Sequence, residues 1–140
     1  MADRRRFLQV LALAATQVGC PFWAKPARGP LDAGLGKDVP VGSLRVLDGP
    51  VALGRDEKGL YALSTICAHR GCDIREHGSI APTGIHCTCH GSDYDRNGHV
   101  THGPADRDLE HYRVEVRGDG HVIVHGGELV APDARTALSG

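Results

Sequence analysis

The chain has 140 residues, a formal net charge of −1 and an aromatic content of only 4%. A charge this close to neutral argues against a general affinity for nucleic acid, and the length leaves room for one small domain. Gly accounts for 19 residues, which favours tight turns over long helices. A core built mainly from Val, Leu and Ile in so short a chain would gain from a bound metal group or a disulfide.

The first 24 residues carry an export motif. The run Asp3-Arg-Arg-Arg-Phe-Leu-Gln9 resembles the twin-arginine signal, in which two arginines precede a variable residue, Phe and Leu. The apolar stretch 10–18 is shorter than the roughly 20 residues that span a bilayer. Residues 1–24 are therefore expected to be an export signal or a short membrane tether on the periplasmic side. Cys20 follows an imperfect lipobox and is a candidate for lipidation, with cleavage elsewhere and an uncleaved anchor as alternatives.

The rest of the chain is predicted to form strands. Residues 25–38 are rich in Pro and Gly and are expected to be a linker, and residues 126–140 show no motif and are expected to be a loose tail. No 3.6-residue periodicity is sustained between them. Short apolar runs separated by turn sequences such as Asn97-Gly98 predict an antiparallel all-β sandwich or barrel. These runs cover residues 43–47, 50–54, 60–64, 80–86, 111–117 and 121–125.

Two segments between the predicted strands hold four of the five cysteines. Each offers one ligand pair, Cys67 with His69 in the first and Cys87 with His90 in the second. Two thiolates and two imidazoles suit a [2Fe–2S] cluster with Cys on one iron and His on the other. A structural zinc site accepts the same set, but zinc sites usually group their cysteines apart from their histidines. A zinc-stabilised interaction module also leaves the second cysteine of each segment unexplained, and a metal-free copy is the remaining alternative.

These segments, with the string Cys89-His-Gly-Ser-Asp-Tyr-Asp95, resemble the Rieske iron–sulfur family. The resemblance covers roughly residues 39–125. It implies the Rieske fold, an all-β sandwich or barrel with a small inserted cluster-binding subdomain, and one [2Fe–2S] cluster per chain. The closest type is the respiratory one, which implies a disulfide between Cys72 and Cys89 that joins the two cluster loops.

The same resemblance assigns roles to four neighbouring residues. Ser92 would donate a hydrogen bond to a bridging sulfide, and Tyr94 would donate one to the sulfur of Cys67. Donors aimed at sulfur stabilise the reduced cluster, so we expect a potential in the upper part of the range of about −150 to +300 mV. Gly103 and Pro104 would belong to a segment that covers the cluster from one side.

The implied function is one-electron transfer within an oxidoreductase complex rather than free-standing catalysis. The preferred hypothesis is the iron–sulfur subunit of a quinol–cytochrome c reductase-like complex, with partners of the cytochrome b or c type. A disulfide and an export motif disfavour a cytosolic ferredoxin for an oxygenase, whereas the small subunit of a periplasmic enzyme such as arsenite oxidase is the alternative. Arg70 stands where quinol-oxidising relatives usually carry Leu, which weighs against direct quinol contact. The other histidines are expected to lie on the surface or on strand faces.

Overall fold

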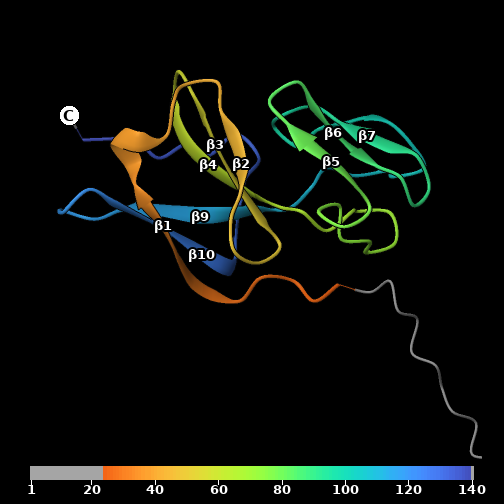
Figure 1. Ribbon diagram of the computed structural model, residues 1–140, viewed down its shortest axis with the longest axis horizontal. Coiled ribbons are helices and arrows are strands. Elements are labelled where there is room, and N and C mark those ends of the chain that lie inside the picture. The colour runs from red at the N-terminus through yellow and green to blue at the C-terminus, as the bar shows by residue number, and fades with distance from the viewer. Residues whose placement is uncertain (1–23, 140) are drawn as a thin grey trace, which may run out of the picture.

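The computed structural model describes residues 24–139, so the predicted export signal and Cys20 lie outside the described residues. Figure 1 shows two sheets, the larger at the left and the smaller at the right, and every pairing in them is antiparallel. Among the described residues, no helix is long and apolar enough to cross a membrane. The prediction of an all-β fold with a small inserted subdomain is confirmed.

The larger sheet, here called the base sheet, has six strands. The 3-10 turn η1 (Gly36–Asp38) directly follows the strand at one edge of this sheet. The smaller sheet lies between the fourth and the ninth strand in sequence, and residues 65–110 are called the inserted subdomain. The base strands, in spatial order, are β1 (Gly29–Leu35), β10 (His121–Val130), β9 (His111–Val116), β4 (Gly59–Ser64), β3 (Val51–Asp56) and β2 (Leu44–Val46).

Strands β3 and β4 are buried on both faces, which explains why their sequences read as continuous apolar runs. Leu53 and Leu60 pack into the apolar core of the base sheet. On the opposite face, Tyr61 and Leu63 belong to a second core that the base shares with the inserted subdomain. Burying a side chain of this size contributes about 1.5–3 kcal/mol, so the central hairpin holds both halves of the molecule together.

The prediction of a linker at 25–38 is wrong, because half of this segment is strand β1 and the 3-10 turn η1 follows it. β1 pairs with β10, and Pro30 is tolerated there because β1 is an edge strand. Ala27 is buried just before it, against Gly126, where an added Cβ would lie 2.9 Å from the backbone of Ala27. The Pro and Gly content indicated a linker, but pairing with a strand about 90 residues away decides the structure.

The expected loose tail is also wrong. β10 continues to Val130 through a bulge at Gly127, whose φ of 84° favours glycine. Farther along, Thr136 and Leu60 exchange backbone hydrogen bonds of 2.8 and 2.9 Å. Arg135 donates to the carboxylate of Asp56 at 2.6 Å. These contacts fasten the tail to the β3–β4 hairpin.

The inserted sheet consists of four short strands, and the predicted run 80–86 is in fact a hairpin. Its strands are β5 (Gly78–Ala81), β6 (Gly84–Cys87), β7 (Ser92–Tyr94) and β8 (Val100–His102), in that spatial order. The predicted Asn97-Gly98 turn joins β7 to β8, and Gly98 has a φ of 79°. Asp95 accepts hydrogen bonds there from the backbone N–H groups of Asn97 at 2.8 Å and His99 at 3.0 Å.

Candidate metal centre

The first metal-binding loop leaves the end of β4 and returns toward β5 as a closed turn. The N–H of Cys67 donates to the carbonyl of Cys72 at 2.8 Å, and the N–H of Gly71 donates back to Cys67 at 3.0 Å. Gly71 has a φ of 75°, which suits glycine at this position. The turn therefore fixes Cys67 at the base of the loop and places the His69–Arg70 pair at its tip.

Asp73 anchors this loop, a role that the sequence analysis missed. It is buried, and it accepts hydrogen bonds from the N–H of Arg75 at 3.0 Å, the guanidinium of Arg75 at 2.6 Å and the hydroxyl of Thr65 at 3.4 Å. Burial alone would raise the pKa of Asp73, but the bonds and charge of Arg75 outweigh it and hold the pKa below its usual range. An Asp two residues before an Arg, directly after Cys72, was the available signal for a side-chain-capped turn.

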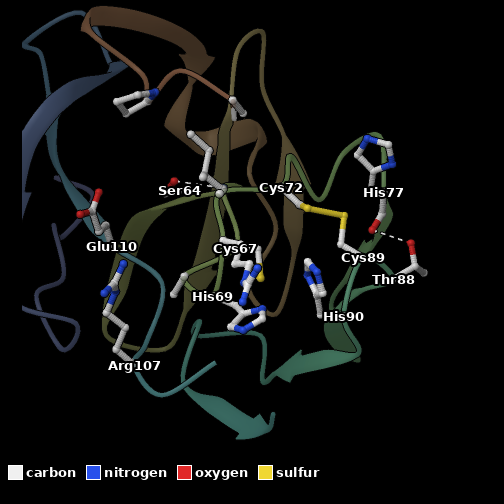
Figure 2. Close-up of a pocket in the computed structure, with 16 residues that line it drawn as sticks. Ser64, Cys67, His69, Cys72, His77, Thr88, Cys89, His90, Arg107 and Glu110 are labelled. Carbon is white, nitrogen blue, oxygen red and sulfur yellow. Dashed lines mark hydrogen bonds between the residues drawn. A yellow bond between two sulfur atoms is a disulfide. The ribbon is translucent and has the colours of Figure 1, made fainter. Parts of the chain in front are cut away.

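The second loop joins β6 to β7. The N–H of Gly91 donates to the carbonyl of Cys87 at 3.0 Å, and the N–H and hydroxyl of Thr88 both donate to the carbonyl of His77 at 2.8 Å. Figure 2 shows the disulfide that bridges this loop to the first one, as the resemblance implied. Cys72 and Cys89 form it with their Cα atoms 6.7 Å apart, so the two loops form one linked unit.

The four predicted ligands converge between the loops. Cys67 and Cys87 are buried and carry free thiols, and Cys67 is close enough to raise the pKa of Cys87. The rings of His69 and His90 meet edge to face, with centroids 4.7 Å apart. Nδ1 of His69 is buried and has no hydrogen-bond partner. A buried polar atom without a partner is costly, and a metal ion bound at Nδ1 would remove that cost.

The electrostatics of these groups fit metal binding. Burial raises the pKa of the Cys87 thiol to about 11, with the neighbouring Cys67 acting in the same direction. Burial also lowers the pKa of His69, and the positive charges of His90 and Arg70 lower it further. His69 therefore favours its neutral, metal-ligating form, while Cys87 gives up its proton when a metal binds.

Two buried thiols and two imidazoles fit a [2Fe–2S] cluster. Zinc accepts the same four ligands. The second cysteine of each loop is not a ligand in either case, because the two form the disulfide. The sulfur atoms of Cys72, Cys87 and Cys89 lie within 4.8 Å of one another, and the disulfide occupies two of them. That group therefore offers a single thiolate, from Cys87.

Tyr94 occupies its predicted position against Cys67. Its hydroxyl lies 3.2 Å from the sulfur of Cys67 and accepts a hydrogen bond from the N–H of Ala68 at 3.1 Å. When Cys67 is a thiolate, Tyr94 is the donor of this pair. Burial and the adjacent Cys67 raise the pKa of Tyr94, so its hydroxyl keeps its proton.

Ser92 connects the predicted covering segment to the site. Ser92 is fully buried, and its oxygen accepts a hydrogen bond from the N–H of Ala105 at 3.1 Å. This bond leaves the hydroxyl proton of Ser92 available to another acceptor. An added Cβ at Gly103 would lie 2.5 Å from the carbonyl oxygen of Ala105, so the tight turn requires glycine, whereas Pro104 is exposed. The predicted hydrogen bond from Ser92 to a sulfide stays a prediction.

An open groove of about 1020 Å³ runs past the tips of both loops. His69, His90 and the exposed Arg70 line it. The first described residue, Ala24, also lines the groove, and its N–H donates to the carbonyl of Gly71 at 3.1 Å. The sequence analysis missed this contact, since it assigned residue 24 to the predicted export signal or tether. The chain that enters β1 therefore touches the first loop directly.

Comparisons with known proteins agree with this geometry. A family model described as "Rieske [2Fe-2S] domain" matches residues 31–113. The chain is 30% identical over 138 residues to the cytochrome b6-f complex iron-sulfur subunit of Chlorobaculum tepidum, covering 87% of this chain and 75% of that protein. It is 41% identical over 59 residues to the subunit of the same name from Synechococcus sp. (strain JA-2-3B'a(2-13)), covering 42% of this chain and 33% of that protein.

Among solved structures, the cyanobacterial plasma membrane Rieske protein PetC3 from Synechocystis PCC 6803 is similar, with a TM-score of 0.51 and 27% identity. That similarity covers 67% of this chain and 97% of the cyanobacterial chain. The fold of this chain thus agrees with the family that the sequence comparisons show.

Proposed function

The chain belongs to the Rieske [2Fe-2S] domain family, and on this premise we propose that it is the high-potential iron–sulfur subunit of a quinol–cytochrome c reductase-like complex. Electron transfer through a [2Fe–2S] cluster is common to the family. The high potential, the type of complex and the site on the periplasmic side of the membrane are our proposals. The similarity to cytochrome b6-f iron-sulfur subunits supports the complex, and the disulfide supports an oxidising compartment.

In this proposal Cys67 and Cys87 hold one iron, and His69 and His90 hold the other. A bound cluster would supply reversible one-electron chemistry. The protein contributes dry, buried thiols on one side and imidazoles that line the open groove on the other. With Nδ1 of His69 directed inward, its Nε2 is the ring atom left to hold a proton toward the groove.

The observation that carries the high-potential assignment is the contact between Tyr94 and Cys67. A hydroxyl that donates to a ligand sulfur disperses its negative charge and stabilises the reduced cluster more than the oxidised one. The N–H of Ala68 fixes the orientation of that hydroxyl, so the donor is preorganised. Ser92 supports the same assignment, because its hydroxyl proton is not used by the bond to Ala105.

Arg70 affects which electron-transfer partner can approach the tip of the first loop. It is exposed at the tip of the first loop, beside His69. A charged side chain at the tip is costly to bury in an apolar quinone pocket. We therefore propose that electrons pass to and from partner proteins at this groove.

The test is a redox titration of the iron-loaded protein followed by electron paramagnetic resonance. We expect a Rieske-type signal on reduction and a midpoint in the upper part of the range of about −150 to +300 mV. Tyr94→Phe keeps the ring and removes the donor, so it should lower the midpoint without loss of the signal. Absence of the signal after iron loading would contradict the cluster, and an unchanged midpoint in Tyr94→Phe would contradict the role of Tyr94.

The type of complex is tested by mild-detergent purification from native membranes. Co-purification with a stoichiometric cytochrome b supports the proposal. Co-purification with a molybdopterin-containing catalytic subunit instead indicates the arsenite oxidase-like alternative.

A further inference from the structure

The hydrogen bond between Tyr94 and Cys67 joins two different strand segments. Cys67 lies in the loop that leaves β4 of the base sheet, whereas Tyr94 is the last residue of β7 in the inserted sheet. The separation of 3.2 Å between the Tyr94 hydroxyl and the Cys67 sulfur therefore depends on how β7 is held against β4.

A second contact fastens the same two segments at another point. Tyr61 lies within β4, and Arg96 follows the end of β7. The hydroxyl of Tyr61 donates to the backbone carbonyl of Arg96 at 2.9 Å. Tyr61 is buried in the core that the base shares with the inserted subdomain, and burial raises the pKa of its hydroxyl, which therefore keeps the proton that it donates. The bond from Tyr61 to Arg96 and the bond from Tyr94 to Cys67 thus hold β7 to β4 at two points.

Arg135 of the C-terminal tail supports the first of these points. Its guanidinium carbon lies 4.2 Å from the centroid of the Tyr61 ring, a cation–π contact. Its Nη2 donates to Oδ1 of Asn97 in the turn after β7 at 3.1 Å, and its Nε donates to Asp56 of β3 at 2.6 Å. Because the guanidinium is planar and has several fixed donors, one side chain connects the tail, the β3–β4 hairpin and the turn between β7 and β8.

The turn between β7 and β8 is held rigidly, so its position is transmitted to Tyr94. Asp95, the next residue after Tyr94, accepts the N–H groups of Asn97 and His99 described above. The N–H of Gly98 donates to the carbonyl of Asp95 at 3.0 Å. An added Cβ at Gly98 would lie 3.4 Å from the side chain of Leu63 on β4, so the turn packs directly on the base sheet. A shift of this turn therefore moves the end of β7.

We propose that Tyr61 and Arg135 are positioning residues for the electron-transfer site, because they hold β7 where the Tyr94 hydroxyl reaches the sulfur of Cys67. This inference rests on the proposed function, since it requires Tyr94 to act on a bound cluster. Hydrogen bonds weaken steeply with distance and misalignment. Loss of either support should therefore weaken the donor, destabilise the reduced cluster and lower its midpoint potential.

The positive charge of Arg135 has to be separated from its positioning role. A cation near the cluster also favours the reduced state, so removal of the charge alone would lower the midpoint. Tyr61→Phe changes no charge and keeps the ring, so it tests positioning alone. Arg135→Lys keeps the charge but loses the planar set of donors.

The experiment is a redox titration of the iron-loaded full chain, followed by electron paramagnetic resonance. Tyr61→Phe and Arg135→Lys should each lower the midpoint, by less than Tyr94→Phe does. The matched control is Tyr112→Phe, which removes a buried tyrosine hydroxyl from the core of the base and should leave the midpoint unchanged. Lower stability by itself does not move the midpoint of the folded protein. A wild-type midpoint in Tyr61→Phe, with a lowered midpoint in Tyr94→Phe, would overturn this inference and leave the proposed function intact.

A double-mutant cycle shows whether the effect passes through Tyr94. In a Tyr94→Phe background, Tyr61→Phe should lower the midpoint no further, because the donor is already absent. A drop of equal size in both backgrounds would overturn the positioning role. An unchanged midpoint in Tyr94→Phe alone, or absence of the Rieske-type signal in the wild type, would contradict the proposed function together with this inference.

Discussion

The base sheet and the inserted subdomain are held together by different kinds of contact. The base has strands of up to ten residues around an apolar core that includes Leu53 and Leu60. The inserted subdomain has strands of three or four residues, and its buried groups include the thiols of Cys67 and Cys87 and the hydroxyl of Tyr94. Hydrophobic burial therefore accounts for the base, whereas the subdomain adds a disulfide, oriented hydrogen bonds and its metal group to the apolar core that it shares with the base.

The largest effect should come from removing a thiolate ligand. Cys87→Ser should abolish the cluster, because a buried hydroxyl is a poor ligand for iron. The base should keep its structure, since Cys87 lies in the core shared with the subdomain and not in the core of the base. Iron content and paramagnetic resonance report the loss, and amide exchange reports each region. Loss of protection across the base as well would contradict the division between the two regions.

A cavity in the core of the base should have the opposite effect, lowering stability while leaving the cluster intact. Leu53→Ala removes a fully buried side chain from the base core, at an expected cost of about 2–5 kcal/mol. Global stability should fall, because β3 and β4 form part of both cores. The cluster should keep its potential, because Leu53 does not belong to the core that contains Cys67, Cys87 and Tyr94. Chemical unfolding measures the first quantity, and redox titration measures the second. A lowered midpoint with unchanged global stability would contradict this prediction.

The disulfide should act mainly on the two loops. A double replacement, Cys72→Ser with Cys89→Ser, opens a link that closes a sequence separation of 17 residues. A loop of about 15 residues corresponds to roughly 3 kcal/mol in the chain-entropy account. We expect faster exchange at the N–H groups of Gly71 and Gly91, which close the two loops, and little change in the base. Equal acceleration at Leu53, a residue of the base core, would show that the disulfide stabilises the whole molecule instead.

The sequence analysis predicted the loops better than the sheet edges, for a physical reason. Cys67 and His69 are predicted ligands close together in one short turn, so their pattern is local and visible. β1 and the tail depend on partners far away in sequence, such as the pairing of Leu60 with Thr136. Pro and Gly in such segments lower the local preference for a strand, and only the neighbouring strand restores it. The anchoring role of Asp73 was missed because its partners become visible only once the loop is closed.

The smallest expected effect is the loss of stability in acid, which both regions share. Asp73 in the first loop and Asp56 in the base both have pKa values below the usual range, and in both cases an arginine partner outweighs the effect of burial. A depressed folded-state pKa contributes stability that is present above the unfolded value of about 3.9 and is lost as the pH falls through the folded value. Acid should therefore weaken both regions over the same window below about pH 4.

Single substitutions then assign the acid response to each region. Asp73→Asn should lower stability at neutral pH by about 1.5–3 kcal/mol, the typical value of hydrogen bonds to a charged group. It should also remove the acid sensitivity of exchange at the N–H of Cys67 and of Gly71, which close the first loop. Asp56→Asn is the matched control, because it removes the negative charge opposite Arg135 and should affect the N–H of Thr136 in the tail instead. If Asp56→Asn also removed the acid response of the first loop, the base and the subdomain would open as one unit, and the comparison between them would fail.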